Sequence, residues 1–427
     1  MEINQKKDQI QNEAVEAWKN NNKQGVVEII TGFGKTFLAL KALYTMPRNK
    51  DVLHLFLAEQ VDREIDLEKD IIKFNKINNC NVHEDYNLKF HCYQTVRNWR
   101  NYKLGLVIAD EIPDSISPEN YKFYLNNRYD ALIGLTALFK GDTVYYIKEE
   151  HIIRNTFDCD IISKKELLDH IAPICFSYNV NQGQIDGTSR KLNIFIIESE
   201  LDNNNKNILA GNAKNKFYQT EAGSYGYLNK LYENTNSLEQ GLLEDFYKFQ
   251  ERKNLQMFSI INRRSKFLYN LPSKIVLVKK LLNDIKDKTV IFSNSLESLK
   301  EVTPNIVSSK NSDDVNTRLR ESFDKGLIRV IGSFKKLVQG ANLNNVDNCI
   351  IMSYYGKEIK LIQMIGRLRQ NGDKDGNVFI FVTKDTQEEV WLTNMMVGIN
   401  NYNIFRGNYE DCLKQYNNEK HTFITNR

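Results

Sequence analysis

The sequence predicts an α/β protein with two lobes, each built on a parallel sheet, and a mixed helical connector between them. Three observations support this fold class. The chain has 427 residues, enough for two or three domains. Short apolar runs alternate with helical patterns before residue 140 and again after residue 274. Hydrophobic residues make up 41% of the chain and charged residues 26%, so we expect a sizeable folded core.

The first lobe is predicted over residues 1–140. Its strands are expected to be continuous apolar runs, which are typical of parallel strands covered on both faces of the sheet. The runs are VVEII (26–30), VLHLFLA (52–58), LKFHCY (88–93), LGLVIA (104–109) and ALIGLT (131–136). Helical patterns separate them, so each pair of strands is expected to be parallel.

The second lobe is predicted over residues 274–385, and it repeats the same rhythm. Its expected strands are TVIF (289–292), LIRVIG (327–332), VDNCIIMS (346–353) and NVFIFVT (377–383). Residues 141–273 are interpreted as a connector and helical excursion, part of which belongs to the second lobe, since LNIFIIE (192–198) has the pattern of a strand. Residues 386–427 are predicted to form a helical tail that packs on the second lobe.

Composition excludes several classes of protein. No apolar run approaches the eighteen or so residues of a membrane span, and the N-terminus lacks the apolar core of a signal peptide. The six cysteines include no CxxC pair, so neither a disulfide framework nor a structural zinc site is indicated. We expect a cytoplasmic protein, and the abundance of residues encoded by A/T-rich codons suggests a bacterial or phage source. The net charge of +4 implies that any polyanion is bound by local patches.

A phosphate-binding loop is predicted directly after the first strand, where a helical pattern begins. Glycines in such a loop let backbone N–H groups point at phosphate oxygens, and the helix N-terminus adds a favourable dipole. A lysine supplies charge to the outer phosphates, and a hydroxyl can bind Mg²⁺. The loop residues are Thr31, Gly32, Phe33, Gly34, Lys35 and Thr36. Ile29 stands where the full pattern has its first glycine, and an ordinary strand-to-helix turn is the alternative interpretation.

Two carboxylates follow the apolar run LGLVIA, and they complete the predicted site. Asp110 and Glu111 are expected at the carboxyl edge of the sheet, where ligands bind in open α/β folds. We assign Asp110 to the metal, and Glu111 to the orientation or deprotonation of the attacking water. The alternative is a strand that ends in two solvated acids. The phosphate loop at a neighbouring strand end favours the functional interpretation.

Taken together with QMIGRLRQ (363–370), these residues resemble the superfamily 2 helicases and translocases, over residues 9–140 and 274–385. The resemblance implies two RecA-like lobes with ATP in the cleft between them. Gln11 looks like the glutamine that reads adenine in this family, although an exposed position on an amphipathic helix is the alternative. DEIP (110–113) stands where the family has its DExx box.

Further motifs of the first lobe are implied by the same resemblance. LTAL (135–138) looks like the motif that couples ATP to nucleic acid, with Thr136 and Ala137 matching, whereas Leu138 and Phe139 replace the usual Thr-Pro. EQVDREIDLEKDIIKF (59–74) resembles a segment of Swi/Snf-like and phage branch-migration motors. The tripeptide formed by Tyr93, Gln94 and Thr95 resembles a nucleic-acid-contacting motif.

In the second lobe, VIGSFKKLVQGANL (330–343) is similar to the fifth family motif, which gives Gly340 and Asn342 as residues near ATP. QMIGRLRQ is similar to the sixth motif, in which Gln363 belongs to the coupling machinery. The arginine finger is assigned to Arg367, with Arg369 as the substitute, because the usual last arginine falls at Gln370. An arginine of this kind stabilises charge on the transferred phosphate.

Nucleic-acid contacts are expected from backbone-binding cations, because a motor that passes every sequence cannot depend on base edges. Residues 325–370 carry eight Lys or Arg against two acids, and Lys335 and Lys336 lie among them. Arg263 and Arg264 lie in a basic, aromatic segment (258–274) that is interpreted either as a stacking surface for bases or as a helix packed on the second lobe.

The sequence therefore predicts an ATP- and Mg²⁺-dependent helicase or translocase that acts on nucleic acid, with DNA favoured over RNA. Replication, repair or recombination proteins are its expected protein partners. Two alternatives remain open: a nucleotide-dependent clamp with weak or no turnover, and an RNA helicase. A kinase or small GTPase would leave the second lobe unexplained. No separate carboxylate cluster indicates a two-metal nuclease.

Overall fold

Two compact units divide the chain in the computed structural model. Met1–Arg190 forms the first unit, and the second begins at Lys191, inside the segment expected to connect two lobes. No helix in the described ranges is both long and apolar enough to cross a membrane. The structure describes residues 2–30, 32–61, 63–117, 120–137, 139, 144–148, 151–153, 160–211, 214–238, 246–334, 346–354, 368, 375–396 and 403–425.

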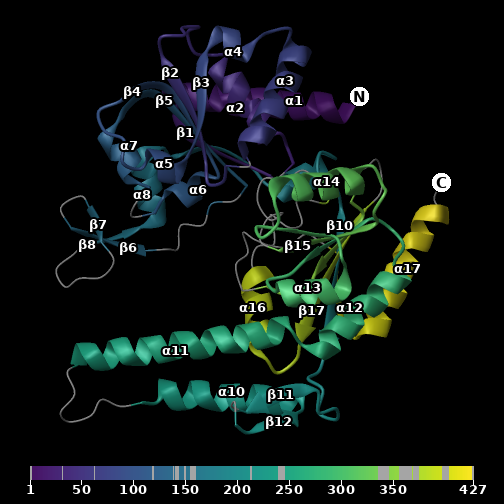
Figure 1. The fold of residues 1–427 in the computed structure, drawn as a ribbon. Helices are drawn as coiled ribbons and strands as arrows, with labels where there is room; N and C mark the ends of the chain where they lie inside the picture. The colour runs from purple at the N-terminus through teal and green to yellow at the C-terminus, as the bar shows by residue number, and fades with distance from the viewer. Residues whose placement is uncertain are drawn as a thin grey trace. The chain divides into compact units, whose positions relative to one another are not determined.

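The first unit is built on a parallel sheet of six strands in the order β3-β2-β4-β5-β1-β9 (Figure 1). Its strands are β1 (Gln24–Ile29), β2 (Leu53–Ala58), β3 (Asn87–Cys92), β4 (Lys103–Asp110), β5 (Arg128–Thr136) and β9 (Ile174–Tyr178). The first five are the apolar runs predicted from the sequence. Strands β2 and β4 bury almost every side chain, because separate hydrophobic clusters cover the two faces of the sheet.

Helices of the first unit connect these strands. They are α1 (Glu2–Asn20), α2 (Lys35–Leu43), α3 (Arg63–Asn78), α4 (Val82–Asp85), α5 (Tyr93–Val96), α6 (Ile112–Ser115), α7 (Lys122–Asn126), α8 (Lys164–Ile171) and α9 (Val180–Ile185). A small antiparallel sheet is formed by β6 (Val144–Lys148), β7 (His151–Ile153) and β8 (Asp160–Ser163).

Helix α1 is held against the sheet by an apolar stripe. Ile10, Ala14 and Trp18 recur at every fourth position and are buried. The indole Nε1 of Trp18 donates a hydrogen bond to the carbonyl oxygen of Leu132, 2.8 Å away. This anchoring fixes the position of Gln11, which lies one residue after the start of the stripe.

The second unit contains a parallel sheet of seven strands in the order β14-β15-β13-β16-β17-β10-β18 (Figure 1). Its strands are β10 (Leu192–Ser199), β13 (Thr289–Phe292), β14 (Ile306–Ser308), β15 (Val330–Phe334), β16 (Asn348–Ile351), β17 (Gly376–Thr383) and β18 (Asn403–Gly407). The predicted fold class, with a parallel sheet in each of two lobes, is confirmed. Strand β10 comes from the expected connector and lies between β17 and β18.

Seven helices of the second unit lie in the described residues. They are α10 (Glu221–Asn236), α11 (Phe246–Tyr269), α12 (Pro272–Asp284), α13 (Leu296–Val302), α14 (Asp313–Asp324), α16 (Gln387–Met396) and α17 (Tyr409–Thr425). The tail was expected to be helical, but it also contributes β18. This strand pairs along β10, and Phe405 stacks on Phe195 with ring centroids 5.4 Å apart, which explains why the segment is extended.

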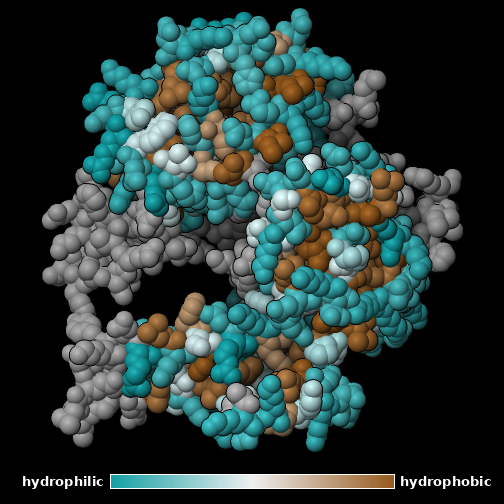
Figure 2. All heavy atoms as spheres, in the orientation of Figure 1, coloured by the Kyte–Doolittle hydropathy of each residue, from teal (hydrophilic) through white to brown (hydrophobic). Residues whose placement is uncertain are grey.

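A helical hairpin, formed by α10 and α11 running side by side, precedes α12 (Figure 1). A two-stranded ribbon of β11 (Ile208–Gly211) and β12 (Lys216–Gln219) lies before it in the chain. Hydrophobic side chains are visible on the surface of this hairpin in Figure 2, and Tyr227, Leu255 and Phe258 are exposed there. Glu221 fastens the hairpin at its start, because its buried carboxylate accepts hydrogen bonds from the backbone N–H groups of Asp202 (3.0 Å) and Ser273 (2.8 Å).

Candidate nucleotide and metal site

The predicted phosphate loop connects β1 to α2 and has the backbone shape that its glycines allow. Gly32 has a φ of 79°, and Gly34, at the N-cap of α2, has a φ of 91°. Both are left-handed conformations that side chains with a Cβ rarely adopt. A Cβ at Gly34 would also lie 2.8 Å from Nε2 of Gln11, so glycine is needed there on two grounds. Thr31 lies outside the described residues.

Gln11 reaches the phosphate loop from α1. Its side chain is buried, and Nε2 donates to the carbonyl oxygens of Phe33 at 3.0 Å and Gly34 at 3.4 Å. Phe33 is buried as well, with its ring 5.1 Å from that of Tyr178. The alternative of an exposed polar position on α1 is therefore wrong, and Gln11 braces the loop. Its role in reading adenine stays a prediction.

The loop lysine and the second carboxylate meet at the carboxyl edge of the sheet. Lys35 Nζ pairs with Oε1 of Glu111, and both side chains are mostly shielded from solvent. Glu111 follows β4 with a left-handed φ of 49°, which turns the chain into α6. Thr136, at the end of β5, donates from Oγ1 to Oε2 of Glu111 at 3.4 Å. Lys35 of the phosphate loop and Thr136 of the coupling motif thus both contact the carboxylate of Glu111, which follows the DExx aspartate. Ala137 follows Thr136 directly in the chain.

Asp110 is buried at the end of β4 and pairs with a residue that the sequence did not single out. Arg63, at the start of α3, donates from Nε to Oδ2 of Asp110 at 2.8 Å, and from Nη2 to Oγ1 of Thr36 at 2.7 Å. Burial alone would raise the pKa of Asp110, but the charges of Arg63 and Lys35 outweigh burial and lower it. Asp110 is consequently ionised at neutral pH.

Arg63 belongs to the segment 59–74 that resembles translocase motors, yet no role was assigned to it. Its position within a run of alternating acids and bases gave it the pattern of a solvated helix face. The usable signal was its place just after the second strand, since the carboxyl ends of parallel strands share one edge.

The donor set at this edge fits a magnesium ion. Thr36 offers a hydroxyl and Asp110 a carboxylate, and Mg²⁺ prefers oxygen ligands of this kind together with phosphate oxygens and water. Oδ1 of Asp110 is buried and has no hydrogen-bond partner among the described residues. An unsatisfied buried carboxylate oxygen is costly, so a cation at this position would satisfy it. Elsewhere in the described ranges, no group of three or more His, Cys, Asp or Glu side chains could hold a metal.

Tyr93 and Arg264 were predicted to contact nucleic acid, but both side chains are buried, so this prediction is wrong for them. Tyr93 lies in the core, where its hydroxyl donates to the backbone carbonyl oxygen of Asp110 at 2.9 Å, while Gln94 and Thr95 are exposed. Arg264 is buried too, donating from Nη2 to Oε1 of Gln387 at 2.9 Å. Both side chains hold elements together, and neither lies at a surface that a nucleic acid could reach.

Arg263, next to Arg264 on α11, is exposed. The interpretation of its segment as a helix packed on the second lobe therefore holds for Arg264, and the surface interpretation is open for Arg263. The remaining second-lobe residues of the predicted site lie outside the described residues, namely Lys335, Lys336, Gly340, Asn342, Gln363, Arg367 and Arg369.

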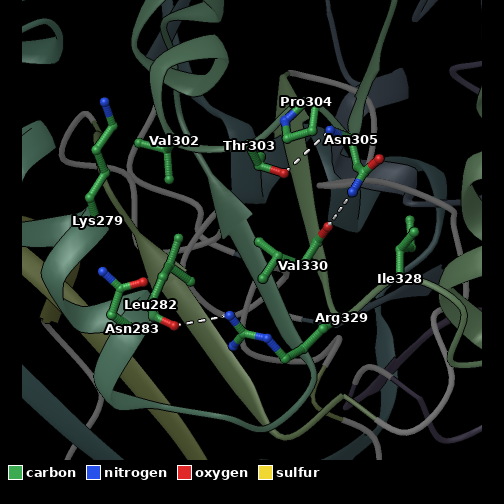
Figure 3. A pocket seen from close by; sticks show the side chains of 10 residues that line it. All are labelled: Lys279, Leu282, Asn283, Val302, Thr303, Pro304, Asn305, Ile328, Arg329 and Val330. Carbon is green, nitrogen blue, oxygen red and sulfur yellow. Dashed lines mark hydrogen bonds between the residues drawn. The ribbon is translucent and has the colours of Figure 1, made fainter.

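A cavity of about 530 Å³ in the second unit is lined by none of the predicted site residues, although Val330, the first residue of the segment similar to the fifth motif, lies at its wall (Figure 3). Arg329 lies at its wall, but its guanidinium donates to the backbone carbonyl oxygens of Leu282 at 2.9 Å and Ile285 at 2.8 Å. The amide of Asn305 likewise donates to the carbonyl oxygen of Val330. These two side chains therefore bind backbone carbonyl groups, and we assign the cavity no chemistry.

Comparison with known families and proteins gives matches to parts of this chain. Residues 1–141 match the family described as type III restriction enzyme, res subunit. A curated DNA 3'-5' translocase, XPB2 of Sulfurisphaera tokodaii, is 24% identical over 124 residues, which is 28% of this chain and 28% of that protein. The chain therefore spans little more than a quarter of the length of this relative.

Solved structures match over both units. A variant of S. cerevisiae Dbp5 bound to RNA and ADP BeF3 has a TM-score of 0.57 at 11% identity, covering 97% of this chain and 93% of that one. The ATP-dependent type ISP restriction-modification enzyme LlaBIII bound to DNA has a TM-score of 0.55 at 11% identity, covering 92% of this chain and 30% of that one. Likeness at this level of identity establishes the fold alone.

The fold of these structures confirms the predicted fold class: each of the two units is a RecA-like lobe built on a parallel sheet.

Proposed function

We propose that this protein is an ATP-driven translocase that moves along DNA. One observation carries the proposal: at one edge of the first sheet, Lys35 pairs with Glu111, and Arg63 bridges Thr36 and Asp110. A loop that binds phosphate, beside carboxylates that hold a metal and orient water, is the arrangement that nucleoside triphosphate hydrolysis requires.

Each side chain has a distinct task in this proposal. Lys35 leaves its pair with Glu111 to bind the outer phosphates. Thr36 and Asp110 would hold Mg²⁺, which would supply positive charge to offset that of the phosphates. Glu111, once released, orients the attacking water and accepts its proton. The hydrogen bond from Thr136 to Glu111 gives β5 a means of sensing that change.

The second lobe supplies the remaining groups. Arg367, or Arg369 in its place, contacts the terminal phosphate and stabilises the charge of the transition state, an effect worth roughly a thousandfold or more in comparable NTPases. Gly340 and Asn342 lie near the nucleotide, and Gln363 takes part in coupling. Release of phosphate weakens these contacts. Each turnover therefore changes the distance between the nucleic-acid-binding surfaces of the two lobes.

DNA is the proposed polymer. The matched relative is named a DNA translocase, and one of the similar structures is a restriction enzyme bound to DNA. Dbp5, bound to RNA, shares the same fold, so the fold by itself does not select the polymer. Gln94, Thr95, Lys335 and Lys336 are proposed to contact the sugar-phosphate backbone, and replication, repair or recombination proteins are the proposed protein partners.

Steady-state ATP hydrolysis by the full chain tests the proposal. We expect duplex DNA to stimulate turnover, and the substitutions Lys35→Ala and Glu111→Gln to reduce the stimulated rate by at least about a hundredfold, since each removes a group that acts on the reacting phosphate. Lys19→Ala, which removes an exposed lysine of the same unit, is the control. Stronger stimulation by matched RNA would reject DNA as the polymer. Nucleotide-dependent DNA binding without phosphate release would establish the clamp instead.

A further inference from the structure

The guanidinium of Arg63 lies where a metal ion would be bound. It bridges Oγ1 of Thr36 at 2.7 Å and Oδ2 of Asp110 at 2.8 Å, the two protein oxygens best suited to magnesium in this site. The side chain is mostly shielded from solvent and lies over the ring of Phe56, with 5.8 Å between Cζ and the ring centroid. The position of the Arg63 guanidinium is therefore fixed by three contacts, with Thr36, Asp110 and Phe56.

We propose that Arg63 is a positioning residue that takes the place of magnesium until a metal-bound nucleotide displaces it. The inference rests on the proposed function, because it assumes that Thr36 and Asp110 hold the metal. Asp110 and Glu111 are adjacent carboxylates, and each is neutralised by one cation of the protein, Arg63 and Lys35 respectively. The charges of the two carboxylates are thus balanced by side chains of the protein itself.

This balance has a consequence for the order of loading. A magnesium ion entering alone would add two positive charges beside Arg63 and Lys35, which the two carboxylates already neutralise. Magnesium entering with a triphosphate brings its own negative charge, so that Lys35 can turn to the phosphates while Arg63 gives up Thr36 and Asp110. Free magnesium is excluded, and the metal-nucleotide complex is admitted.

Displacement of Arg63 also moves charge at the first turn of α3. Arg63 is the first residue of that helix, and the carboxylates of Asp66 and Asp70 on the same helix are close enough to act on its charge. Once displaced, the guanidinium of Arg63 can pair with these carboxylates instead. Nucleotide loading is in this way coupled to the start of α3, directly after the carboxyl end of β2.

Binding of a fluorescent ATP analogue to the full chain, with excess Mg²⁺ and with EDTA, tests the proposal. The quantity compared is the affinity for the analogue in Mg²⁺ divided by the affinity in EDTA. In Arg63→Gln the competing cation is gone, so this ratio is expected to rise about tenfold above that of the unsubstituted protein. Arg63→Lys keeps the charge but cannot bridge both oxygens, and we expect its ratio to lie between the two. Arg48→Gln, which removes an exposed arginine of the same unit, should keep the original ratio.

Thermal unfolding with Mg²⁺ alone provides a second readout. Magnesium should raise the Tm of Arg63→Gln and leave that of the unsubstituted protein unchanged, because only the variant has a vacant anionic site. A purely structural role for Arg63 would lower affinity equally in Mg²⁺ and EDTA, and an unchanged ratio in both Arg63 variants overturns the inference. Failure of the unsubstituted protein to bind the analogue in either condition overturns the proposed function instead.

Discussion

His54 shows how one buried side chain links the structure to pH. It lies on β2 almost completely buried, and Nδ1 accepts a hydrogen bond from the backbone N–H of Leu106 at 2.9 Å. Gly105 makes room for the ring, since a Cβ there would lie 2.6 Å from Cε1 of His54. Burial lowers the pKa of His54, only partly offset by the nearby charge of Asp130, so the imidazole is neutral in the folded protein.

The folded protein should therefore lose stability as the pH falls below about 6.5, the ordinary pKa of a histidine. The unfolded chain takes up the proton first, so the stabilisation is complete above that pH and is lost below it, by at most about 1.4 kcal/mol per pH unit. His54→Asn, which retains an acceptor for Leu106, should reduce this loss. The difference in the free energy of unfolding between pH 7.5 and pH 5.5, measured with urea, gives this loss. His83→Asn, a substitution at an exposed position, is the control. An equal loss in His54→Asn would contradict the assignment.

At the scale of the element, a buried ion pair joins two helices of the second unit. Lys274 of α12 pairs with Glu388 of α16, and neither side chain is exposed. Lys274 also donates to the carbonyl oxygen of Leu268, at the end of α11, and Glu388 accepts from the backbone N–H of Thr383 at the end of β17. The pair therefore fixes the root of the helical hairpin to the sheet.

Removal of one partner of this pair should be strongly destabilising. Lys274→Met leaves the carboxylate of Glu388 buried without its cation, and we expect a loss of about 3–5 kcal/mol in the free energy of unfolding. Lys279→Met, on the same helix, breaks an exposed pair with Glu301 and should cost less than about 1 kcal/mol. Equilibrium urea unfolding compares the two. Equal losses would show that burial of the pair has no energetic consequence.

Strands and motifs could be predicted because their signals are local. Continuous apolar runs identified β1 to β5 and most of the second sheet, and glycines identified the phosphate loop. Contacts between segments distant in the chain left no such signal. Arg63 has the pattern of a solvated residue, and Tyr93 and Arg264 have the composition of a nucleic-acid surface. Tertiary packing nevertheless buries Tyr93 and Arg264 and shields most of the Arg63 side chain. Strand β18 was missed because its pairing with β10 decides its conformation.

At the scale of the whole molecule, the residues proposed for ATP turnover are divided between two compact units. The phosphate loop and both carboxylates belong to the first unit, Met1–Arg190, whereas the proposed arginine finger, Arg367 or Arg369, comes from the sequence predicted to form the second lobe. The chain has 58 basic and 54 acidic residues, so its net charge gives little attraction for a polyanion such as DNA. Binding of DNA must therefore depend on local basic groups. The proposed function therefore predicts that ATP turnover requires groups from both units.

Displacement of a third strand from duplex DNA tests the central claim most directly, because it detects movement without strand separation. The full chain is expected to release the third strand in ATP and Mg²⁺, and to leave it bound with a non-hydrolysable ATP analogue or after Lys35→Ala. Release that is independent of ATP, or DNA-stimulated ATP hydrolysis with the third strand still in place, would contradict the account.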